Sequence, residues 1–216
     1  MSKLLSLNIG RSMDVDYSDP GRSGIDKRPV VGPVAVADPG PQGVAGSGLA
    51  GDDVVDRRFH GGDDQAVYAF AREDLDRWEG VLGRELPNGV FGENFTTLGV
   101  EVNSALIGER WRVGEVVLEV TSPRIPCRTF AVWLGEKGWV RRFTQDARPG
   151  AFLRVVEPGV VRAGDGITVL SRPDHEVTVE FLFRALTTEG ALLPRTMVAI
   201  DVINRSYAES IRKRLG

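Results

Sequence analysis

The chain has very little cysteine and histidine. Its 216 residues include one cysteine, Cys127, and two histidines. No disulfide can therefore form within the chain, and no cysteine cluster is available for an iron–sulfur centre. No flavin or nicotinamide fingerprint is present, and we expect no haem in this chain either.

The chain also lacks an excess of one charge and a long apolar run. It contains 27 Lys and Arg residues and 30 Asp and Glu residues, so its formal net charge is −3. A chain with this balance provides no basic field for nucleic acid. No apolar stretch approaches the roughly 18 residues of a membrane span. The apolar run near the N-terminus is too short for a secretion signal. These features predict a cytoplasmic protein that binds neither nucleic acid nor a membrane.

Glycine and proline punctuate most of the chain, with 26 and 12 residues respectively, and they separate short β-rich runs. Many short strands joined by Gly turns favour a barrel or closed sheet over a parallel α/β sheet. We therefore predict a mainly β fold with some α-helix. The expected strands span residues 3–9, 28–36 and 66–70, a hairpin over 105–121, and a further pair over 151–156 and 167–170.

Two regions have helical spacing instead. Residues 72–82 place Leu75, Trp78 and Leu82 on one face, with Gly83 as the C-cap, and we expect Trp78 to be a core anchor rather than a ligand-stacking residue. After residue 172 glycine and proline thin out. We predict a β-rich domain over residues 1–172 and a small extension over 173–216, whose three helices are expected at 177–186, 194–204 and 206–215.

Cys127 follows a turn that is stiffened by Pro123 and Pro126, and Arg124 and Arg128 flank the thiol. Adjacent cations favour the thiolate, which is both a nucleophile and a metal ligand. A lone cysteine more often packs as a small hydrophobic residue. A position between arginines after a Pro-rich turn is not typical of a core, so Cys127 is a candidate ligand.

The segment around His60 is the second candidate. Gly61 and Gly62 follow the histidine just before an apolar strand, which predicts a tight loop whose backbone approaches another group closely. Exposed N–H groups in such a loop bind anions, and Arg57 would strengthen the site. Taken alone, the segment fits a surface loop with a solvated histidine somewhat better than a binding site.

Two further clusters carry weaker signals. The turn Phe91-Gly92-Glu93-Asn94 offers a carboxylate and an amide for the edge of a heterocycle, although an asparagine there also caps backbone groups in many proteins. Lys27 and Arg28 are candidates for holding a phosphate, and a solvated charge pair at the start of a strand is the alternative.

Together these segments resemble the MOSC family, which is named for the C-terminal domain of molybdenum cofactor sulfurases. The family pattern has a His-Gly-Gly-x-Asp loop, a Phe-Gly-Glu-Asn turn and a late Pro-Arg-x-Pro-Cys. All three occur here in order, at 60–64, 91–94 and 123–127. The resemblance covers roughly residues 3–170. One departure is Gln65, because relatives usually carry Lys or Arg after the loop aspartate.

The helical tail is similar to the three-helix extension of the stand-alone bacterial branch, which is associated with reducing N-hydroxylated bases such as 6-hydroxylaminopurine. The resemblance implies a MOSC-type β-barrel, a molybdopterin-type cofactor and Cys127 as the ligand to molybdenum. It also implies a reductase that takes electrons from a separate flavoprotein. The oligomeric state stays open, with a homodimer among the candidates.

The resemblance and the residue types together define an expected site. His60 or Glu93 is expected to supply a proton during N–O cleavage, beside the catalytic Cys127. The residues expected to bind the cofactor are Lys27, Arg28, Arg57, His60, Gly61, Gly62, Asp64, Phe91, Gly92, Asn94, Arg124 and Cys127.

Two other functions fit part of the same pattern. In a non-catalytic carrier, Cys127 would hold a persulfide or bind the cofactor for delivery to another protein. In a Cys–His hydrolase, Cys127 and His60 would act together, although no local signature of a known cysteine hydrolase is present.

Overall fold

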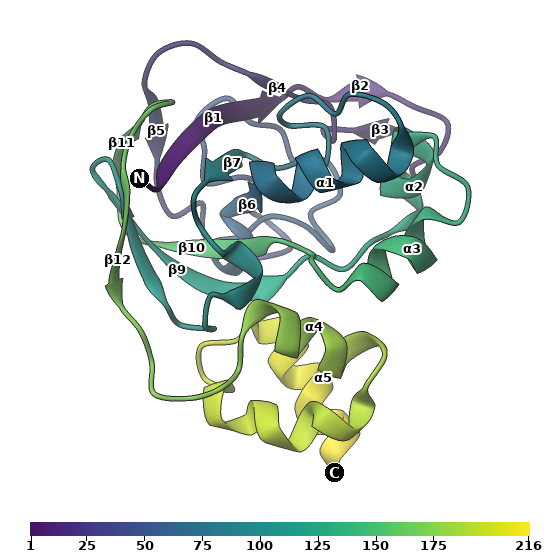
Figure 1. The fold of residues 1–216 in the computed structure, drawn as a ribbon, viewed down its shortest axis with the longest axis vertical. Coiled ribbons are helices and arrows are strands. Elements are labelled where there is room, and N and C mark those ends of the chain that lie inside the picture. The colour runs from purple at the N-terminus through teal and green to yellow at the C-terminus, as the bar shows by residue number, and fades with distance from the viewer.

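An eight-stranded sheet forms the centre of the fold in the computed structural model, which describes residues 1–216 (Figure 1). All neighbouring strands run antiparallel except β6 and β7, which run parallel. In spatial order the strands are β12 (Ile167–Ser171), β8 (Arg110–Val113), β9 (Val116–Pro123), β10 (Ala151–Glu157), β6 (Val67–Ala71), β7 (Phe95–Leu98), β1 (Lys3–Gly10) and β4 (Lys27–Pro29). Two small ladders flank the sheet, β11 (Gly159–Val161) with β5 (Val34–Val36) and β2 (Met13–Asp14) with β3 (Arg22–Ser23).

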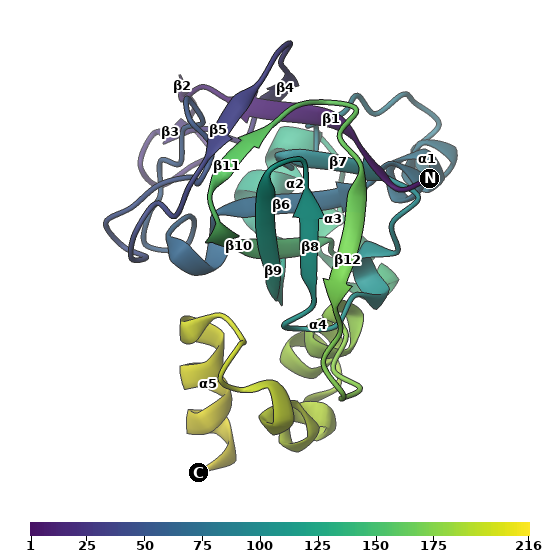
Figure 2. The same ribbon diagram turned by 90° about the vertical axis from the view of Figure 1, so that its left-hand side faces the viewer.

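The sheet curls but is not the closed barrel that the resemblance implies. Its ends meet near the start of β1, where Lys3 and Gly166 form a single bridge and the Leu4 N–H donates to the Asp165 carbonyl at 2.8 Å. In Figure 2, β1 lies crosswise to β12 rather than beside it, so the two strands form no ladder. Helix and strand contents are also similar, at 29% and 27%, so the fold is a mixed α/β fold with one large sheet.

The expected strands are present, but one of them divides into two strands and one expected pairing is wrong. The hairpin of β8 and β9 turns between Val113 and Val116, as predicted. The run over residues 28–36 divides into β4 and β5, which join different sheets, and its prolines cannot donate to a ladder. The strands at 151–157 and 167–171 do not pair with each other, because β10 lies between β9 and β6 while β12 pairs with β8.

Helix α1 (Arg72–Leu82) has the predicted bounds and ends at Gly83, which is left-handed at φ 67°. Trp78 is 3% exposed and packs edge-on against Trp139 with 4.6 Å between ring centroids, as expected of a core anchor. Two further helices follow Cys127 and were not predicted, α2 (Arg128–Leu134) and α3 (Trp139–Asp146). Together the three helices enclose a second, largely aromatic core beside the sheet.

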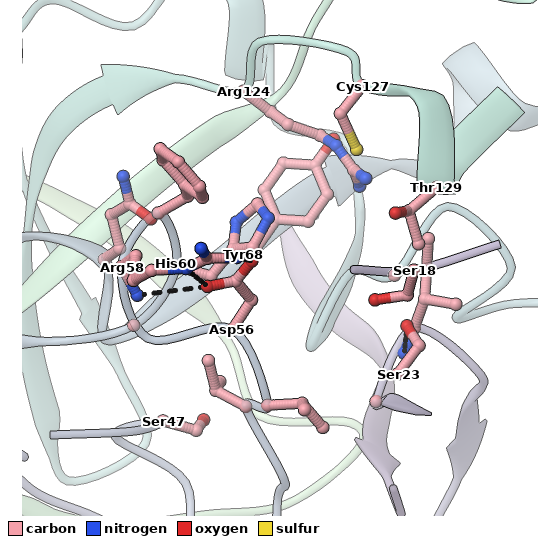
Figure 3. Close-up of a pocket in the computed structure, with 18 of the residues that line it drawn as sticks. Ser18, Ser23, Ser47, Asp56, Arg58, His60, Tyr68, Arg124, Cys127 and Thr129 are labelled. Atoms are coloured by element: carbon pink, nitrogen blue, oxygen red, sulfur yellow. Dashed lines mark hydrogen bonds and ion pairs between the residues drawn. The ribbon is translucent and has the colours of Figure 1, made fainter. Parts of the chain in front are cut away.

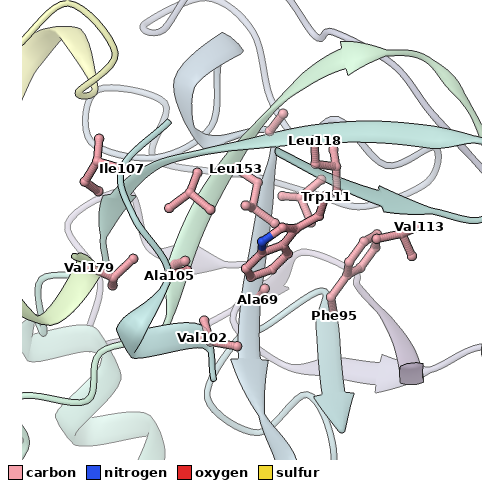
Figure 4. Close-up of a cluster of buried hydrophobic side chains, with 14 of the residues drawn as sticks. Ala69, Phe95, Val102, Ala105, Ile107, Trp111, Val113, Leu118, Leu153 and Val179 are labelled. Atoms are coloured by element: carbon pink, nitrogen blue, oxygen red, sulfur yellow. The ribbon is translucent and has the colours of Figure 1, made fainter. Parts of the chain in front are cut away.

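The tail forms α4 (Val179–Thr187), the 3-10 helix η3 (Gly190–Ala199) and α5 (Arg205–Leu215). The first and third lie close to the predicted helices, whereas η3 begins and ends four to five residues before the helix expected at 194–204. Short 3-10 turns also occur at η1 (Asp63–Gln65) and η2 (Val102–Ser104). The tail packs against the main core, and Figure 4 places Val179 of α4 near Ala105 and Ile107. The division at residue 172 remains a prediction. No helix in the structure has both the length and the apolar character that crossing a bilayer requires.

Candidate functional site

A cavity of about 650 Å³ opens where several loops meet beside the sheet. Its lining comes from the β2–β3 hairpin, the segment before η1, strand β6, the loop between β9 and α2, and the first turn of α5. Figure 3 shows part of this lining, with Cys127 and Arg124 projecting from the same loop. Seven of the predicted site residues line the cavity, namely Lys27, His60, Gly61, Gly92, Asn94, Arg124 and Cys127.

Cys127 sits at the N-terminal end of α2, in extended backbone at φ −128°. Its thiol is free and partly exposed, and the side chain also packs against the aromatic core. The structure contains no group of three or more His, Cys, Asp or Glu side chains arranged to hold a metal ion. A metal at Cys127 would therefore need further ligands from a bound cofactor.

Arg124 is a buried cation without an acidic partner. Its side chain is 7% exposed, and no carboxylate lies within ion-pair distance. The guanidinium donates to the Phe91 carbonyl and lies 4.1 Å from the ring centroid of Phe130, while its Nε has no partner. An uncompensated buried charge is costly. The cavity is therefore suited to an anionic ligand, and the phosphate of a pterin cofactor fits this requirement.

Lys27 and Asn94 are held in a buried network with Asp52. Lys27 and Asp52 form an ion pair in which both side chains are less than one-tenth exposed. The Asn94 amide donates to Asp52 at 2.9 Å, and its oxygen accepts from the Tyr68 N–H at 3.2 Å. The Asn94 side chain is thus used to join strands, and Asp52 compensates the charge of Lys27. Both residues shape the cavity wall, and neither offers a free group like that of Arg124.

His60 is partly buried in the cavity wall, and the pKa of its imidazole is lowered to about 4. Burial is the main cause, since it disfavours the charged form, and the positive charge of Arg124 adds to it. Asp56 acts in the opposite direction. At neutral pH the His60 imidazole is therefore uncharged. It can accept a proton or donate a hydrogen bond, but it is not an imidazolium that can act directly as an acid.

This state of His60 should make folding depend on pH. The unfolded chain binds a proton near pH 6.5, and the folded chain binds it only near pH 4, so stability falls as the pH drops through that window. Between pH 7 and pH 5 His60 should contribute a loss of about 2 kcal/mol. Urea unfolding of the wild type and of His60→Asn at both pH values measures it. An equal loss in the two proteins, or an imidazole that titrates near pH 6.5 by NMR, would contradict this account.

Glu93 lies outside the cavity, fully buried in the turn before β7. Its carboxylate accepts from the backbone N–H groups of Gly89 and Phe91 and from the Thr96 hydroxyl. Burial raises the pKa of this carboxyl. The arrangement gives no support to the expected proton-donor role, because every oxygen of the group is already engaged in holding the turn. Phe91 is likewise buried, in the aromatic core.

Replacing Glu93 with alanine should therefore destabilise the fold rather than remove a catalytic group. The change leaves two buried N–H groups without an acceptor, and we expect a loss of about 2–4 kcal/mol in the free energy of unfolding. Chemical denaturation measures that loss. A Glu93→Ala protein of unchanged stability that has lost activity would restore the catalytic interpretation.

Gly92 allows Arg124 to enter the cavity. It has a φ of 76°, and a Cβ there would lie 3.3 Å from Ile25 and 3.4 Å from the Arg124 guanidinium. A side chain would both strain the backbone and press on the cation.

Arg28 and Arg57 do not reach the cavity. Arg28 is exposed and pairs with Asp26 at 2.7 Å. Arg57 is exposed and donates to the Val44 carbonyl at 2.7 Å. The neighbour of Arg57, Arg58, is the residue that lines the cavity, where it pairs with Asp56 at 2.8 Å.

Gly62 and Asp64 contact other segments of the chain rather than the cavity. A Cβ on Gly62 would lie 2.5 Å from the Gln42 backbone, and its N–H donates to the Gly46 carbonyl at 2.9 Å. The close approach predicted for the double glycine is therefore real, but at Gly62 it is to another loop of the same chain. Asp64 pairs with Arg154 at 2.7 Å and does not line the cavity.

Sequence reasoning missed several lining residues. Tyr68 lies on β6, and the sequence marked that strand only as apolar. Asp52 belongs to an Asp-Asp pair in a Gly-rich stretch, a signal that a search for buried partners of Lys27 could have used. Ser206 and Tyr207 come from α5, and nothing in the sequence connects that helix to Cys127.

Comparison with known proteins identifies relatives of this chain. A profile of the MOSC domain family matches residues 56–168. The chain is 34% identical over 182 residues to the uncharacterized protein YflK of Bacillus subtilis (strain 168), covering 84% of this chain and 79% of YflK. It is 29% identical over 140 residues to protein YiiM of Escherichia coli (strain K12), covering 62% and 60%. It is 28% identical over 177 residues to a protein named reductase from Gibberella moniliformis, covering 76% of this chain and 31% of that protein.

Solved structures share the fold. The crystal structure of YiiM from Geobacillus stearothermophilus matches with a TM-score of 0.80 at 24% identity, covering 100% of both chains. The crystal structure of YiiM from Escherichia coli matches with a TM-score of 0.74 at 20% identity, covering 99% of this chain and 92% of that one. The likeness spans the sheet and the helical tail together.

Proposed function

This chain belongs to the MOSC domain family, and from that premise we propose that it is a molybdenum-cofactor-dependent reductase of N-hydroxylated compounds. The observation that carries the proposal is the pairing of a free thiol, Cys127, with an unpaired buried cation, Arg124, in one cavity. A soft sulfur donor suits molybdenum, and the cation suits the phosphate of a pterin. The relative named reductase supports the class of reaction.

Each residue then has a defined part. Cys127 supplies the protein ligand to the metal. Arg124 binds the cofactor phosphate. Lys27 attracts the phosphate more weakly, because its charge is neutralised by Asp52. When bound, the cofactor supplies two electrons for cleavage of the N–O bond, and the protein binds, orients and excludes water.

The overall reaction consumes two protons. R–NH–OH with two electrons and two protons gives R–NH₂ and water. His60, uncharged in the cavity wall, relays protons from solvent by accepting one and passing it on, and it needs no ionised resting form. The electrons come from a separate flavoprotein. We retain the cytoplasmic location and the candidate homodimer as parts of the proposal.

The experiment combines metal analysis with a reduction assay. Protein made in a host that synthesises the cofactor should carry about one molybdenum per chain. Under anaerobic conditions with a chemical electron donor, it should convert 6-hydroxylaminopurine to adenine at a rate that scales with molybdenum content. Activity in a metal-free preparation would rule the proposal out.

The alternatives from the sequence receive less support from the geometry. A sulfur carrier presents its cysteine to a recipient protein, whereas Cys127 lies within a cavity whose walls come from several segments. Mass spectrometry of the Cys127 peptide would reveal an added sulfur. A Cys–His hydrolase needs the thiol and imidazole to be hydrogen-bonded, and no hydrogen bond joins Cys127 to His60.

A further inference from the structure

The helical tail contributes directly to the cavity that contains Cys127. Ser206 and Tyr207, in the first turn of α5, line it. Ser206 and Arg58 also line a smaller polar pocket next to α5, so the tail borders the cavity on the Arg58 side. In Figure 3, Arg58 and Cys127 lie on opposite sides of Tyr68. The cavity therefore has a thiol side and a side formed with α5.

Gln65 is an unsatisfied polar group in this cavity. Its side chain is 5% exposed, it lines the cavity, and its Oε1 makes no hydrogen bond within the chain. A buried acceptor without a donor costs about 1–3 kcal/mol, and a ligand that donates to it would recover that energy. The relatives' Lys or Arg would place a charge at this position, whereas the amide offers one acceptor and two donors.

Asp64, which precedes Gln65 in the chain, links this segment to α5. The Asp64 carboxylate accepts from the backbone N–H of Arg205, the first residue of α5, at 2.8 Å. Its backbone carbonyl accepts from the Thr121 hydroxyl at 2.6 Å. Asp64, predicted to bind the cofactor, thus instead fixes η1 against the helix that carries Tyr207.

Tyr207 completes this side of the cavity. Its ring is partly buried against the main core, and no group in the chain forms a hydrogen bond with its hydroxyl. Burial raises its pKa to about 12, so the group stays a neutral O–H donor. The ring of Phe152 lines the same cavity, is only partly buried and offers flat apolar surface. The ring of Tyr68, 5.0 Å away between centroids and tilted by 37°, is 3% exposed and packs against Phe152 and the Arg124 guanidinium.

We propose that Gln65 and Tyr207 are specificity-determining residues that recognise a flat nitrogen heterocycle carrying an N–H donor beside a ring nitrogen. This inference rests on the proposed function and names the substrate-recognition groups of the same site. A glutamine amide matches the N9–H and N3 edge of a purine by accepting from the ring N–H and donating to the neighbouring ring nitrogen, and this contact leaves the N-hydroxyl group at the other end free to face Cys127. Phe152, which is only partly buried and lines the cavity, contacts the flat face of the heterocycle. An aliphatic hydroxamic acid has neither the flat face nor the second edge.

The test compares two substrates in Gln65→Leu and Tyr207→Phe, with Gln145→Leu as the matched control on the exposed face of α3. The substrates are 6-hydroxylaminopurine and acetohydroxamic acid, assayed with the same electron donor. Gln65→Leu should lower kcat/KM for the purine about tenfold, mainly through KM, and leave the hydroxamate value and the molybdenum content unchanged. Tyr207→Phe should act in the same direction, and Gln145→Leu should match the wild type. An unchanged purine-to-hydroxamate ratio in both cavity variants would overturn the inference.

Adenine binding separates this inference from the proposed function. Calorimetry with adenine needs no turnover, and it should show about tenfold weaker binding to Gln65→Leu than to the wild type. That result in a protein without reductase activity would support the recognition site and reject the reductase. Equal binding of adenine by both proteins, or no binding by either, would overturn the inference whatever the reductase assay shows.

Discussion

Cys127→Ala should lose bound molybdenum and more than about 100-fold of the reduction rate. Even residues that only support a metal ligand cost about 10–100-fold when replaced, and removing the ligand itself should cost more. No second side chain in the structure can take its place, because there is no other cysteine and no His, Asp or Glu cluster suited to a metal. Metal content per chain and the rate of 6-hydroxylaminopurine reduction measure the two losses.

The fold of this variant should be intact, because Cys127 is only partly buried. Ser210→Ala, an equally small change on the exposed face of α5, serves as the control and should retain metal and activity. Cys127→Ser tests the sulfur specifically, since it keeps the shape of the side chain and replaces the soft donor by a hard one. Full activity in Cys127→Ser would contradict the ligand assignment.

Arg124→Met should weaken cofactor retention about 30-fold or more. Arg124 is the buried cation of the cavity that has no acidic partner, so an anion loses its main counter-charge, and truncating one partner of a buried charge pair costs about 2–5 kcal/mol. Arg124→Lys keeps the charge without the planar fork and should retain part of the binding. Pterin released from the purified proteins, quantified by fluorescence, gives the measurement, and Arg141→Met on the exposed face of α3 is the control.

The same variant should change His60. Arg124 lowers the pKa of that imidazole, so Arg124→Met should raise it from about 4 toward its ordinary value, while burial keeps it below 6.5. NMR titration of His60, with His175 replaced to leave one imidazole signal, follows this shift. A pKa that does not move, together with unchanged pterin content, would show that the charge of Arg124 does not act in the cavity.

The sequence predicted local structure well where the signal was short-range. Helix α1 has the predicted bounds because its apolar spacing and its terminal Gly83 are both local. The hairpin of β8 and β9 follows from one Gly turn in the same way. The pairing of β10 with β9 and β6 could not be predicted, because strand order depends on contacts between distant segments. The two helices after Cys127 were not predicted because both are short, and α2 begins directly beside the Pro-rich turn.

For the candidate site, the motifs identified the right loops but not what each side chain does. Cys127 and Arg124 have side-chain groups available to a ligand in the cavity. In a second motif, the Glu93 carboxylate accepts from backbone N–H groups and the Asn94 amide donates to Asp52. A motif gives residue types and spacing, but hydrogen-bond partners come from elsewhere in the chain. That Tyr207 lines the cavity could not be predicted for the same reason, because the tail is brought to the cavity by packing against the main core.

X-ray absorption at the molybdenum edge tests the central claim, that Cys127 binds the metal of a pterin cofactor, most directly. The measurement counts sulfur neighbours of the metal and does not depend on knowing the substrate. The account predicts that cofactor-loaded wild type has one more sulfur ligand than Cys127→Ser loaded in the same host. An equal number of sulfur ligands in both proteins would contradict it.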